Sequence, residues 1–269
     1  MKPFRAAVVQ MTSGDDRERN LRVAEDLVRR AAQSKAQLVG LPENFSWMGA
    51  EKDKAQFVED LDGMVLRRMA GLARDLGVHL LAGSIMERGA PDGRAYNTSV
   101  LLTPEGTRLA VYRKIHLFDV AIPDGATYHE SKTIAPGADP VVAKAPFAAI
   151  GMTVCYDLRF PELYRRLSAS GAEVVTVPAA FTLHTGKDHW EVLLRARAIE
   201  NLSYVFAPAQ YGRHNEKRVT YGHAMIVDPW GAVVARASDG EGIAIADLDP
   251  GLLIRARTEL PSLSHRRLQ

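Results

Sequence analysis

The sequence predicts an α/β or α+β fold with a mixed sheet, and two patterns carry that prediction. Short apolar runs alternate along the chain with stretches in which apolar residues recur at helical spacing. The runs at 96–102 and 108–112 are separated by a turn segment that contains Pro104 and Gly106, which predicts a hairpin. Antiparallel pairing therefore enters the sheet, and a mixed sheet with helices on its outer faces is favoured over a purely parallel barrel.

Apolar runs also predict the other strands of the N-terminal half, and helical spacing predicts its two helices. In the first helix, Leu21, Leu27 and Ala31 fall on one face. The second helix is followed by Gly77, the residue type best suited to end a helix in the left-handed conformation. Strands are expected at 6–11, 37–41 and 78–85, and helices over 21–31 and 64–76.

In the C-terminal half, the apolar run 149–154 stops at Cys155 and a helix is expected soon afterwards. Pro161 suits the first position of that helix because its fixed φ is already helical. Asp188 and Glu191 are spaced like a capping box and predict the start of a later helix. The elements expected here are helices over 161–170 and 188–200, and strands at 174–177, 204–209, 223–227, 232–235 and 243–247.

The composition is that of one globular domain, expected to span residues 1–269. A chain of this length with 46% hydrophobic content can bury a sizeable core. The formal net charge of +2, from 34 basic and 32 acidic residues, indicates neither a nucleic-acid nor a membrane partner. No signal peptide or membrane span is recognised. A single cysteine excludes an internal disulfide framework and fits the reducing cytoplasm, the expected location.

Three reactive or ionisable side chains stand where strand-like runs end. Cys155 follows the run 149–154, Glu43 follows a second apolar run, and Lys114 closes a third. The carboxyl ends of strands in open α/β sheets are where ligands bind, so these side chains can converge in space. A thiolate is a strong nucleophile, but a thiol needs a nearby base or cation to form it at neutral pH. The three residues together predict nucleophilic catalysis.

Each of these residues also has a purely structural interpretation. An isolated cysteine is often a small buried hydrophobe, Glu43 can be an ordinary loop carboxylate, and Lys114 can be a surface lysine. Pairing of Cys155 with a histidine base, as in papain-like proteases, is a further alternative. None of the eight histidines carries the local signature of that family.

Neither a metal nor a nucleotide cofactor is expected. His184, Asp188 and His189 are close in sequence, but the two histidines lack the i, i+4 spacing of a helical zinc pair. The glycines near the C-terminus sit among turn signals and begin no phosphate-binding motif. The candidate chemistry therefore rests on side chains alone.

Three segments resemble the signature segments of the nitrilase superfamily of carbon–nitrogen hydrolases, in the same order. They are 41–45 (Leu-Pro-Glu-Asn-Phe), 112–119 (Tyr-Arg-Lys-Ile-His-Leu-Phe-Asp) and 155–162 (Cys-Tyr-Asp-Leu-Arg-Phe-Pro-Glu). The similarity extends over essentially the whole chain. It implies the superfamily's fold, a four-layer α-β-β-α sandwich, which the residue pattern alone does not specify.

The resemblance also implies roles for individual residues in amide hydrolysis. The catalytic triad of the superfamily falls on Glu43, Lys114 and Cys155, and a further glutamate falls on Glu130. The thiol would attack the amide and form a thioester, Glu43 would act as general base, and Lys114 would stabilise the oxyanion. Glu130 would orient neighbouring groups. The backbone N–H of Tyr156 is the expected second oxyanion donor, by analogy with other nucleophile turns.

Substrate choice is indicated by two segments that resemble different branches of the superfamily. Residues 127–137 resemble the ω-amidase branch, which acts on α-ketoglutaramate, whereas residues 211–223 resemble the branch of deaminated glutathione amidases. The second segment is the more distinctive, so that branch is favoured. Both substrates carry carboxylates, for which Arg159 is the nearest candidate partner. The basic segment 213–218 would contribute further contacts if it borders the cleft.

Alternatives to this activity are a nitrilase and a non-catalytic relative that uses the cleft only for binding. The presence of all four family residues argues against the second alternative. The resemblance also implies a homodimer or a larger homo-oligomer, formed through helices near the cysteine. Residues 160–167 are the first segment expected to contact a second copy.

Overall fold

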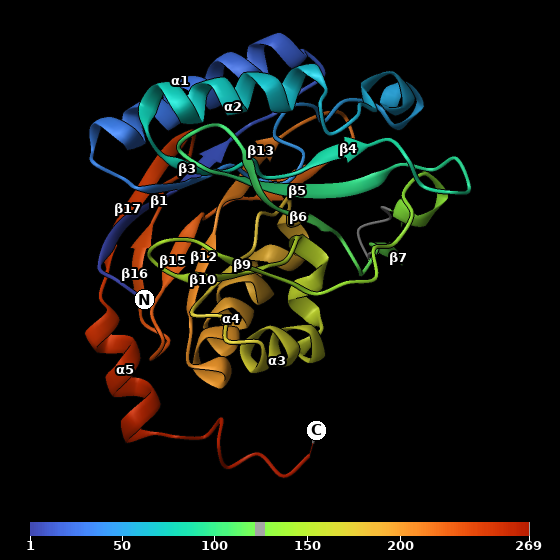
Figure 1. Ribbon diagram of the computed structural model, residues 1–269. Helices are drawn as coiled ribbons and strands as arrows, with labels where there is room; N and C mark the ends of the chain where they lie inside the picture. The colour runs from blue at the N-terminus through green and yellow to red at the C-terminus, as the bar shows by residue number, and fades with distance from the viewer. Residues whose placement is uncertain (122–126, 269) are drawn as a thin grey trace.

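The computed structural model describes residues 1–121 and 127–268 and contains two β-sheets stacked between two layers of helices (Figure 1). Helices α1 and α2 cover the outer face of one sheet, and α3 and α4 cover the outer face of the other. This is the four-layer α-β-β-α arrangement that the resemblance implied. The covering helices are α1 (Arg17–Gln33), α2 (Met64–Leu76), α3 (Pro161–Ala169) and α4 (Leu183–Asn201).

The first sheet is mixed, with a parallel centre. β1, β2 and β3 run parallel, whereas β17 pairs antiparallel with β1, and β6 pairs antiparallel with β5 as the predicted hairpin. The strand order is β14-β13-β1-β2-β3-β5-β4. The strands are β1 (Phe4–Met11), β2 (Leu38–Gly40), β3 (His79–Leu81), β4 (Ile85–Glu87), β5 (Tyr96–Leu102), β6 (Arg108–Arg113), β13 (Ala209–Arg213), β14 (Val219–Tyr221) and β17 (Gly242–Leu248).

The second sheet has the order β16-β15-β12-β11-β10-β9, again with a parallel centre. Its strands are β9 (Val141–Lys144), β10 (Ala149–Met152), β11 (Val174–Thr176), β12 (Tyr204–Ala207), β15 (Met225–Val227) and β16 (Val233–Arg236). A separate antiparallel pair and four further helices complete the described elements. They are β7 (Asp119–Ala121), β8 (Thr127–His129), η1 (Glu51–Phe57), η2 (Glu130–Lys132), η3 (Cys155–Arg159) and α5 (Pro250–Glu259).

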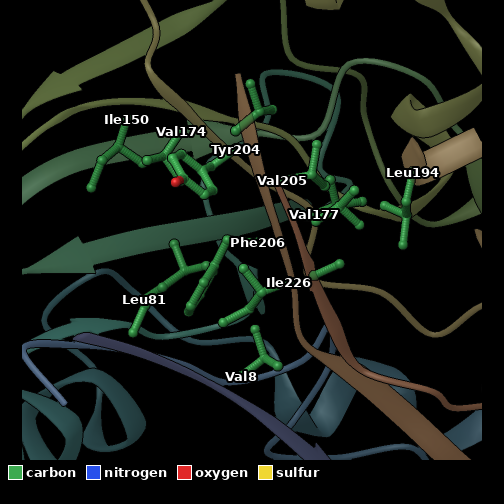
Figure 2. Packing of buried hydrophobic residues seen from close by; sticks show 14 of the residues in the cluster. Val8, Leu81, Ile150, Val174, Val177, Leu194, Tyr204, Val205, Phe206 and Ile226 are labelled. Atoms are coloured by element: carbon green, nitrogen blue, oxygen red, sulfur yellow. The ribbon is translucent and has the colours of Figure 1, made fainter. Parts of the chain in front are cut away.

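Strand β1 is buried on both faces and explains how the layers are held together. Alternate side chains of a strand point to opposite faces, so Val8 packs between the sheets whereas Val9 packs beneath α1 and α2. Figure 2 shows Val8 of the first sheet close to Phe206 and Ile226 of the second sheet. Burial of this apolar surface fixes the two sheets face to face and thereby fixes the strand ends that carry the polar residues.

The structure confirms several predicted elements and divides one predicted strand. Helix α2 has the predicted bounds, and Gly77 ends it with a left-handed φ of 64°. The strand expected at 78–85 is instead β3 and β4, which separate at Gly83. Gly83 has a φ of 34°, and a Cβ there would lie 1.9 Å from the Pro42 carbonyl oxygen. Only glycine allows this close approach to the loop that carries Glu43.

Two further predictions about boundaries were wrong. The strand expected at 204–209 is divided between β12 and β13, which belong to different sheets and flank Pro208. The capping box at Asp188 and Glu191 does not exist, because α4 begins earlier. Thr182 is its N-cap, and the Thr182 side chain accepts a hydrogen bond from the Thr185 N–H.

The apolar side chains of the segment expected to contact a second copy pack within their own chain, and contact of that segment with a second copy stays a prediction. Leu163, Tyr164 and Leu167 are buried in the core of their own chain. Phe160 stacks on His116, with ring centroids 3.7 Å apart. The apolar side chains of α3 are therefore used within the chain. No helix among the described residues is both long and apolar enough to cross a membrane.

Candidate active site

The structure brings Glu43, Lys114, Cys155 and Glu130 to one cavity, although the sequence separates them widely. Glu43 follows β2, Lys114 follows β6 and Cys155 follows β10, so each stands just beyond the end of a strand. Glu130 begins η2, directly after β8. All four residues line a cavity with a volume of about 320 Å³, large enough for a small molecule.

Cys155 occupies a sharp turn between β10 and η3, in agreement with the predicted strand-to-helix turn. Its φ of 48° lies in the left-handed region, which non-glycine residues adopt only where the surroundings enforce it. The Cys155 N–H donates to the Pro178 carbonyl (3.0 Å). The Val154 N–H donates to the buried Asp157 carboxylate (2.8 Å). These bonds hold the turn that presents the thiol to the cavity.

Asp157 also ties this turn to the segment that carries Lys114. Its carboxylate accepts hydrogen bonds from the Tyr112 hydroxyl (2.7 Å) and from the His116 N–H (3.0 Å). Tyr112 and His116 flank Lys114 in the chain, so one carboxylate positions both the nucleophile turn and the lysine. Sequence analysis missed this role. The available signal was a carboxylate two residues after the only cysteine.

Lys114 links the two glutamates of the cavity. Its Nζ lies 3.0 Å from Glu43 Oε1, and 3.1 Å and 2.8 Å from the two carboxylate oxygens of Glu130. The Lys114 and Glu43 side chains are each only 2% exposed. Ion pairs this deeply buried are weak evidence for stability but strong indicators of a functional site, because desolvation is costly.

Asn97 is a further member of this network that sequence analysis missed. Its Nδ2 donates to Glu43 Oε1 (2.9 Å) and to Glu130 Oε1 (3.1 Å). Backbone groups satisfy the other carboxylate oxygens: the Ala180 N–H donates to Glu43 (2.9 Å) and the Phe118 N–H donates to Glu130 (2.7 Å). Both carboxylates are thus held as acceptors in fixed orientations. The signal for Asn97 was an amide near the start of the expected strand 96–102.

The cavity perturbs the pKa values of its ionisable groups. Burial raises the pKa of the Cys155 thiol well above its usual range; the adjacent Glu43 raises it further, and Lys114 opposes this. The neighbour that raises the pKa of the thiol in this way is Glu43, not a histidine. Burial lowers the pKa of Lys114, but Glu130 and Glu43 outweigh this and the net shift is upward. Burial raises the pKa of Glu130, but Lys114 prevails and lowers it to about 2.

These shifts define the resting protonation states at neutral pH. The thiol is protonated, Lys114 carries a positive charge, and Glu130 carries a negative charge. Transfer of the thiol proton to a Glu43 carboxylate would create a thiolate without changing the net charge of the cluster. The arrangement therefore allows a thiolate nucleophile to form in a buried site by proton transfer to Glu43.

The two residues expected to bind substrate lie in different positions. Tyr156 lines the cavity, whereas Arg159 does not. The Arg159 guanidinium packs over the Phe181 ring, 5.1 Å from its centroid, and lies 3.3 Å from His189 Nδ1. Contact of Arg159 with a substrate carboxylate stays a prediction. Of the basic segment 213–218, the side chain of Arg218 does line the cavity.

A metal centre finds no support in the part of the chain that the structure describes. No group of three or more histidine, cysteine, aspartate or glutamate side chains in residues 1–121 and 127–268 is placed to hold a metal ion. His184, Asp188 and His189 lie within α4. The Glu43 and Glu130 carboxylates are occupied by Lys114 and Asn97 instead.

Comparison with known proteins agrees with this geometry. A sequence model of the carbon–nitrogen hydrolase family matches residues 5–258. The chain belongs to this family. It is 49% identical over 269 residues to a deaminated glutathione amidase from Synechocystis sp. strain PCC 6803, with 99% of each chain covered. The resemblance to the nitrilase superfamily is thereby confirmed, and the protein is a carbon–nitrogen hydrolase.

Solved structures of the same superfamily share its fold. The NitFhit protein of Caenorhabditis elegans is 38% identical, with a TM-score of 0.92 over 99% of this chain and 66% of that chain. An amidase from Nesterenkonia sp. AN1 is 29% identical, with a TM-score of 0.78 over 96% of this chain and 98% of that chain. A mutant of that amidase carries acrylamide, added at its active-site cysteine.

Proposed function

We propose that this carbon–nitrogen hydrolase is an amidase that cleaves deaminated glutathione through a thioester on Cys155. One observation carries the chemistry: a buried thiol in a left-handed turn lines the same cavity as the Glu43 carboxylate, which lies 3.0 Å from the ammonium group of Lys114. The Nesterenkonia amidase, which reacts at its cysteine, supports the same role for Cys155.

Acylation begins with proton transfer from the Cys155 thiol to Glu43. The sulfur attacks the amide carbonyl carbon, and the carbonyl π electrons move to oxygen to form a tetrahedral oxyanion. Lys114 and the Tyr156 N–H stabilise that oxyanion. The ammonium group has three donors and contacts three carboxylate oxygens, so the donor of the longer Glu130 contact (3.1 Å) has to turn to the oxyanion. On collapse, the C–N bond breaks and Glu43 returns its proton to the leaving amine.

Deacylation repeats these steps with water as the nucleophile. Glu43 takes a proton from water, the hydroxide adds to the thioester, and the C–S bond breaks to release the carboxylic acid and the thiolate. Glu43 then returns the proton to Cys155. The fixed orientation of Glu43, set by Asn97 and the Ala180 N–H, suits a base that must act on two different partners.

Glu130 positions Lys114 without contacting the reacting atoms in this mechanism. We expect Glu130→Gln to lower kcat roughly tenfold to a hundredfold, because Lys114 loses an anionic partner that orients it. Asp119→Asn is the matched control, since Asp119 accepts a hydrogen bond from the neighbouring Ser131 N–H but does not line the cavity. Steady-state kinetics on both variants checks this. Equal rates in Glu130→Gln and wild type would make Glu130 an ordinary loop residue.

The effect of Glu130→Gln on the free energy of unfolding is expected to depend on pH. The pKa of Glu130 falls from 4.5 to about 2 on folding, so its ionisation stabilises the folded state above pH 4.5. That contribution is lost as the pH falls toward 2. Wild type should therefore exceed Glu130→Gln in free energy of unfolding at neutral pH, and the difference should shrink in acid. Urea unfolding at several pH values measures it; a pH-independent difference contradicts the proposed charge interaction.

The substrate is supported by the Synechocystis relative and by the charges at the cavity. Deaminated glutathione carries carboxylates at both ends, and basic side chains that include Lys54, Lys132 and Arg218 line the cavity. The alternative is an ω-amidase that acts on α-ketoglutaramate, the smaller amide with the same acyl group.

An ammonia- and amine-release assay decides between these substrates. We expect kcat/KM to be higher for deaminated glutathione than for α-ketoglutaramate, an aliphatic amide or a nitrile at matched concentrations, since more of its charges find partners. A higher value for α-ketoglutaramate would favour the ω-amidase alternative and keep the mechanism. Activity on the nitrile alone would overturn the amidase assignment.

We further propose that the protein acts in the cytoplasm as a homodimer or larger homo-oligomer. The location is supported by the single reduced thiol on which the mechanism depends. The oligomer is implied by the superfamily resemblance. Residues 160–167 stay the first segment proposed to contact a second copy, through exposed side chains such as Glu162 and Arg166, since the apolar side chains of α3 pack within the chain.

A further inference from the structure

A second cavity, with a volume of about 890 Å³, adjoins the one that contains Cys155. We call the cavity around Cys155 the inner chamber and the second cavity the outer chamber. The two chambers are direct neighbours, since several residues line both. The shared lining residues include Asn44, Glu51, Lys54, Met86, Tyr128 and Arg218.

We propose that the outer chamber binds the leaving-group half of the substrate, a short peptide that ends in a carboxylate, and that Arg218 pairs with that carboxylate. This inference deepens the proposed function and rests on it. In deaminated glutathione the leaving group is cysteinylglycine, whereas in α-ketoglutaramate it is ammonia. Only the first of these reaches the outer chamber.

The direction of the substrate follows from which residues line which chamber. Cys155, Tyr156 and Thr185 line the inner chamber only, so the acyl half that becomes bonded to sulfur lies on their side. The leaving nitrogen has to lie within reach of Glu43, which protonates it. Asn44, next to Glu43 in the chain, lines both chambers. A substituent on that nitrogen therefore extends past Asn44 into the outer chamber.

The walls of the outer chamber suit a short peptide with an anionic end. Trp47 and Met86 provide an apolar surface, and Trp47 is itself braced by stacking on Phe57 at a centroid distance of 4.4 Å. Four basic residues and two acidic residues also line the chamber, which gives it a net positive charge. The basic residues are Lys52, Lys54, Lys217 and Arg218, and the acidic residues are Glu51 and Glu216.

Among these basic residues, Arg218 is best placed to bind a ligand carboxylate. Lys54 already has partners, since its Nζ lies 3.5 Å from Glu51 and 3.1 Å from Thr133 Oγ1. Within residues 1–121 and 127–268, Arg218 forms no ion pair. Its guanidinium makes a single long hydrogen bond, 3.5 Å, to the Ala180 carbonyl. A planar guanidinium without a carboxylate partner is suited to bidentate recognition of one.

The backbone around Arg218 is fixed before any ligand binds. The N–H groups of Lys217 and Arg218 both donate to Asn215 Oδ1 at 2.9 Å. Asn215 Nδ2 in turn donates to the Gly49 carbonyl (3.2 Å) on another wall of the outer chamber. The turn between β13 and β14 is thereby joined to the loop before η1. This pre-organisation reduces the entropy lost when a carboxylate binds.

A pair of charge-neutralising variants tests the role of Arg218. Arg218→Gln removes the guanidinium, whereas Arg213→Gln removes the same charge from the same hairpin at a residue that lines neither chamber. We expect Arg218→Gln to lower kcat/KM for deaminated glutathione about tenfold or more, mainly through KM, and to change α-ketoglutaramate hydrolysis less than about twofold. Arg213→Gln should leave both substrates unchanged. Equal losses on both substrates, or no loss on either, would overturn the proposal.

Binding of the leaving group provides a measurement that does not depend on turnover. Titration calorimetry compares cysteinylglycine with its C-terminal amide, which has the same shape but lacks the carboxylate. Wild type and Arg213→Gln should bind the acid more tightly than the amide, and Arg218→Gln should not distinguish them. If wild type fails to hydrolyse deaminated glutathione but shows this pattern, only the proposed substrate is wrong. If wild type binds acid and amide equally, or binds neither, the assignment of the outer chamber is wrong.

Discussion

Replacement of Cys155 by serine is expected to reduce amide hydrolysis by at least about a thousandfold. A hydroxyl is a far weaker nucleophile than a thiolate, and the loss of a nucleophile that acts with its base removes most of the catalytic effect. Steady-state assays of amine release measure this. Undiminished turnover in Cys155→Ser would exclude the thioester mechanism.

The fold of this variant should be close to that of wild type. The sulfur borders a cavity, so its replacement by a smaller oxygen leaves little new empty space. The serine hydroxyl remains in the same cavity as Glu43 and can act as a hydrogen-bond donor there. We therefore expect the free energy of unfolding to change by only about 1 kcal/mol. A cooperative thermal transition near that of wild type provides the control for the activity loss.

Replacement of Glu43 by glutamine is expected to lower the pKa of the Cys155 thiol and also to lower the rate of amide hydrolysis. The Glu43 charge raises the pKa of Cys155, and Lys114 lowers it. Without the Glu43 charge, the pKa of the thiol should fall, so a larger fraction is thiolate at neutral pH. Hydrolysis should nevertheless fall on the order of a hundredfold or more, because the base that serves both half-reactions is lost.

The single cysteine makes this measurement specific. Ultraviolet absorbance of the thiolate across a pH titration reports on Cys155, and Cys155→Ser supplies the blank. Glutamine has only one oxygen acceptor, so its NH₂ group has to face hydrogen-bond donors. In one orientation the donor is the Ala180 N–H, and in the other the donors are Lys114 and Asn97. This mismatch costs about 1–3 kcal/mol of stability. A variant with near wild-type turnover would remove Glu43 from the mechanism. An unchanged thiol pKa would contradict the electrostatic coupling.

Much of the fold could be predicted because local patterns and global packing agree. Local sequence is enough to specify β1 and α2. An apolar run predicts β1, and the helical spacing of apolar residues followed by Gly77 predicts α2. The wrong boundaries occur where long-range packing decides. Gly83 separates β3 from β4 because the chain passes against Pro42, a contact between segments that the sequence does not place side by side.

The candidate site was predictable in its ionisable members but not in the residues that hold them. Strand ends and the superfamily resemblance indicated Glu43, Lys114 and Cys155. Asn97 joins them because the Lys114 N–H donates to the Asn97 carbonyl (2.8 Å), a neighbour relation set by the β5–β6 register. Register depends on pairing between strands and cannot be read from either strand alone.

The residues proposed to contact the substrate were the least predictable. Arg159 was predicted to bind the substrate carboxylate because it is close to Cys155 in the sequence. In the structure, its side chain packs over Phe181 and does not line the cavity. Arg218 reaches both chambers from a hairpin turn that Asn215 fixes. Side-chain direction in loops depends on such tertiary contacts, which composition and spacing do not report.

The most direct test of the central claim is mass spectrometry of wild-type enzyme that is quenched with acid during turnover of deaminated glutathione. The proposed mechanism predicts a peptide in which Cys155 carries the acyl half of the substrate, bonded through sulfur. In wild type, the adduct should disappear once the substrate is exhausted. In Glu43→Gln, the amount of adduct should be larger if the substitution slows deacylation more than acylation. Continued turnover by enzyme whose Cys155 has been completely alkylated would contradict the mechanism, as would acylation of a different residue.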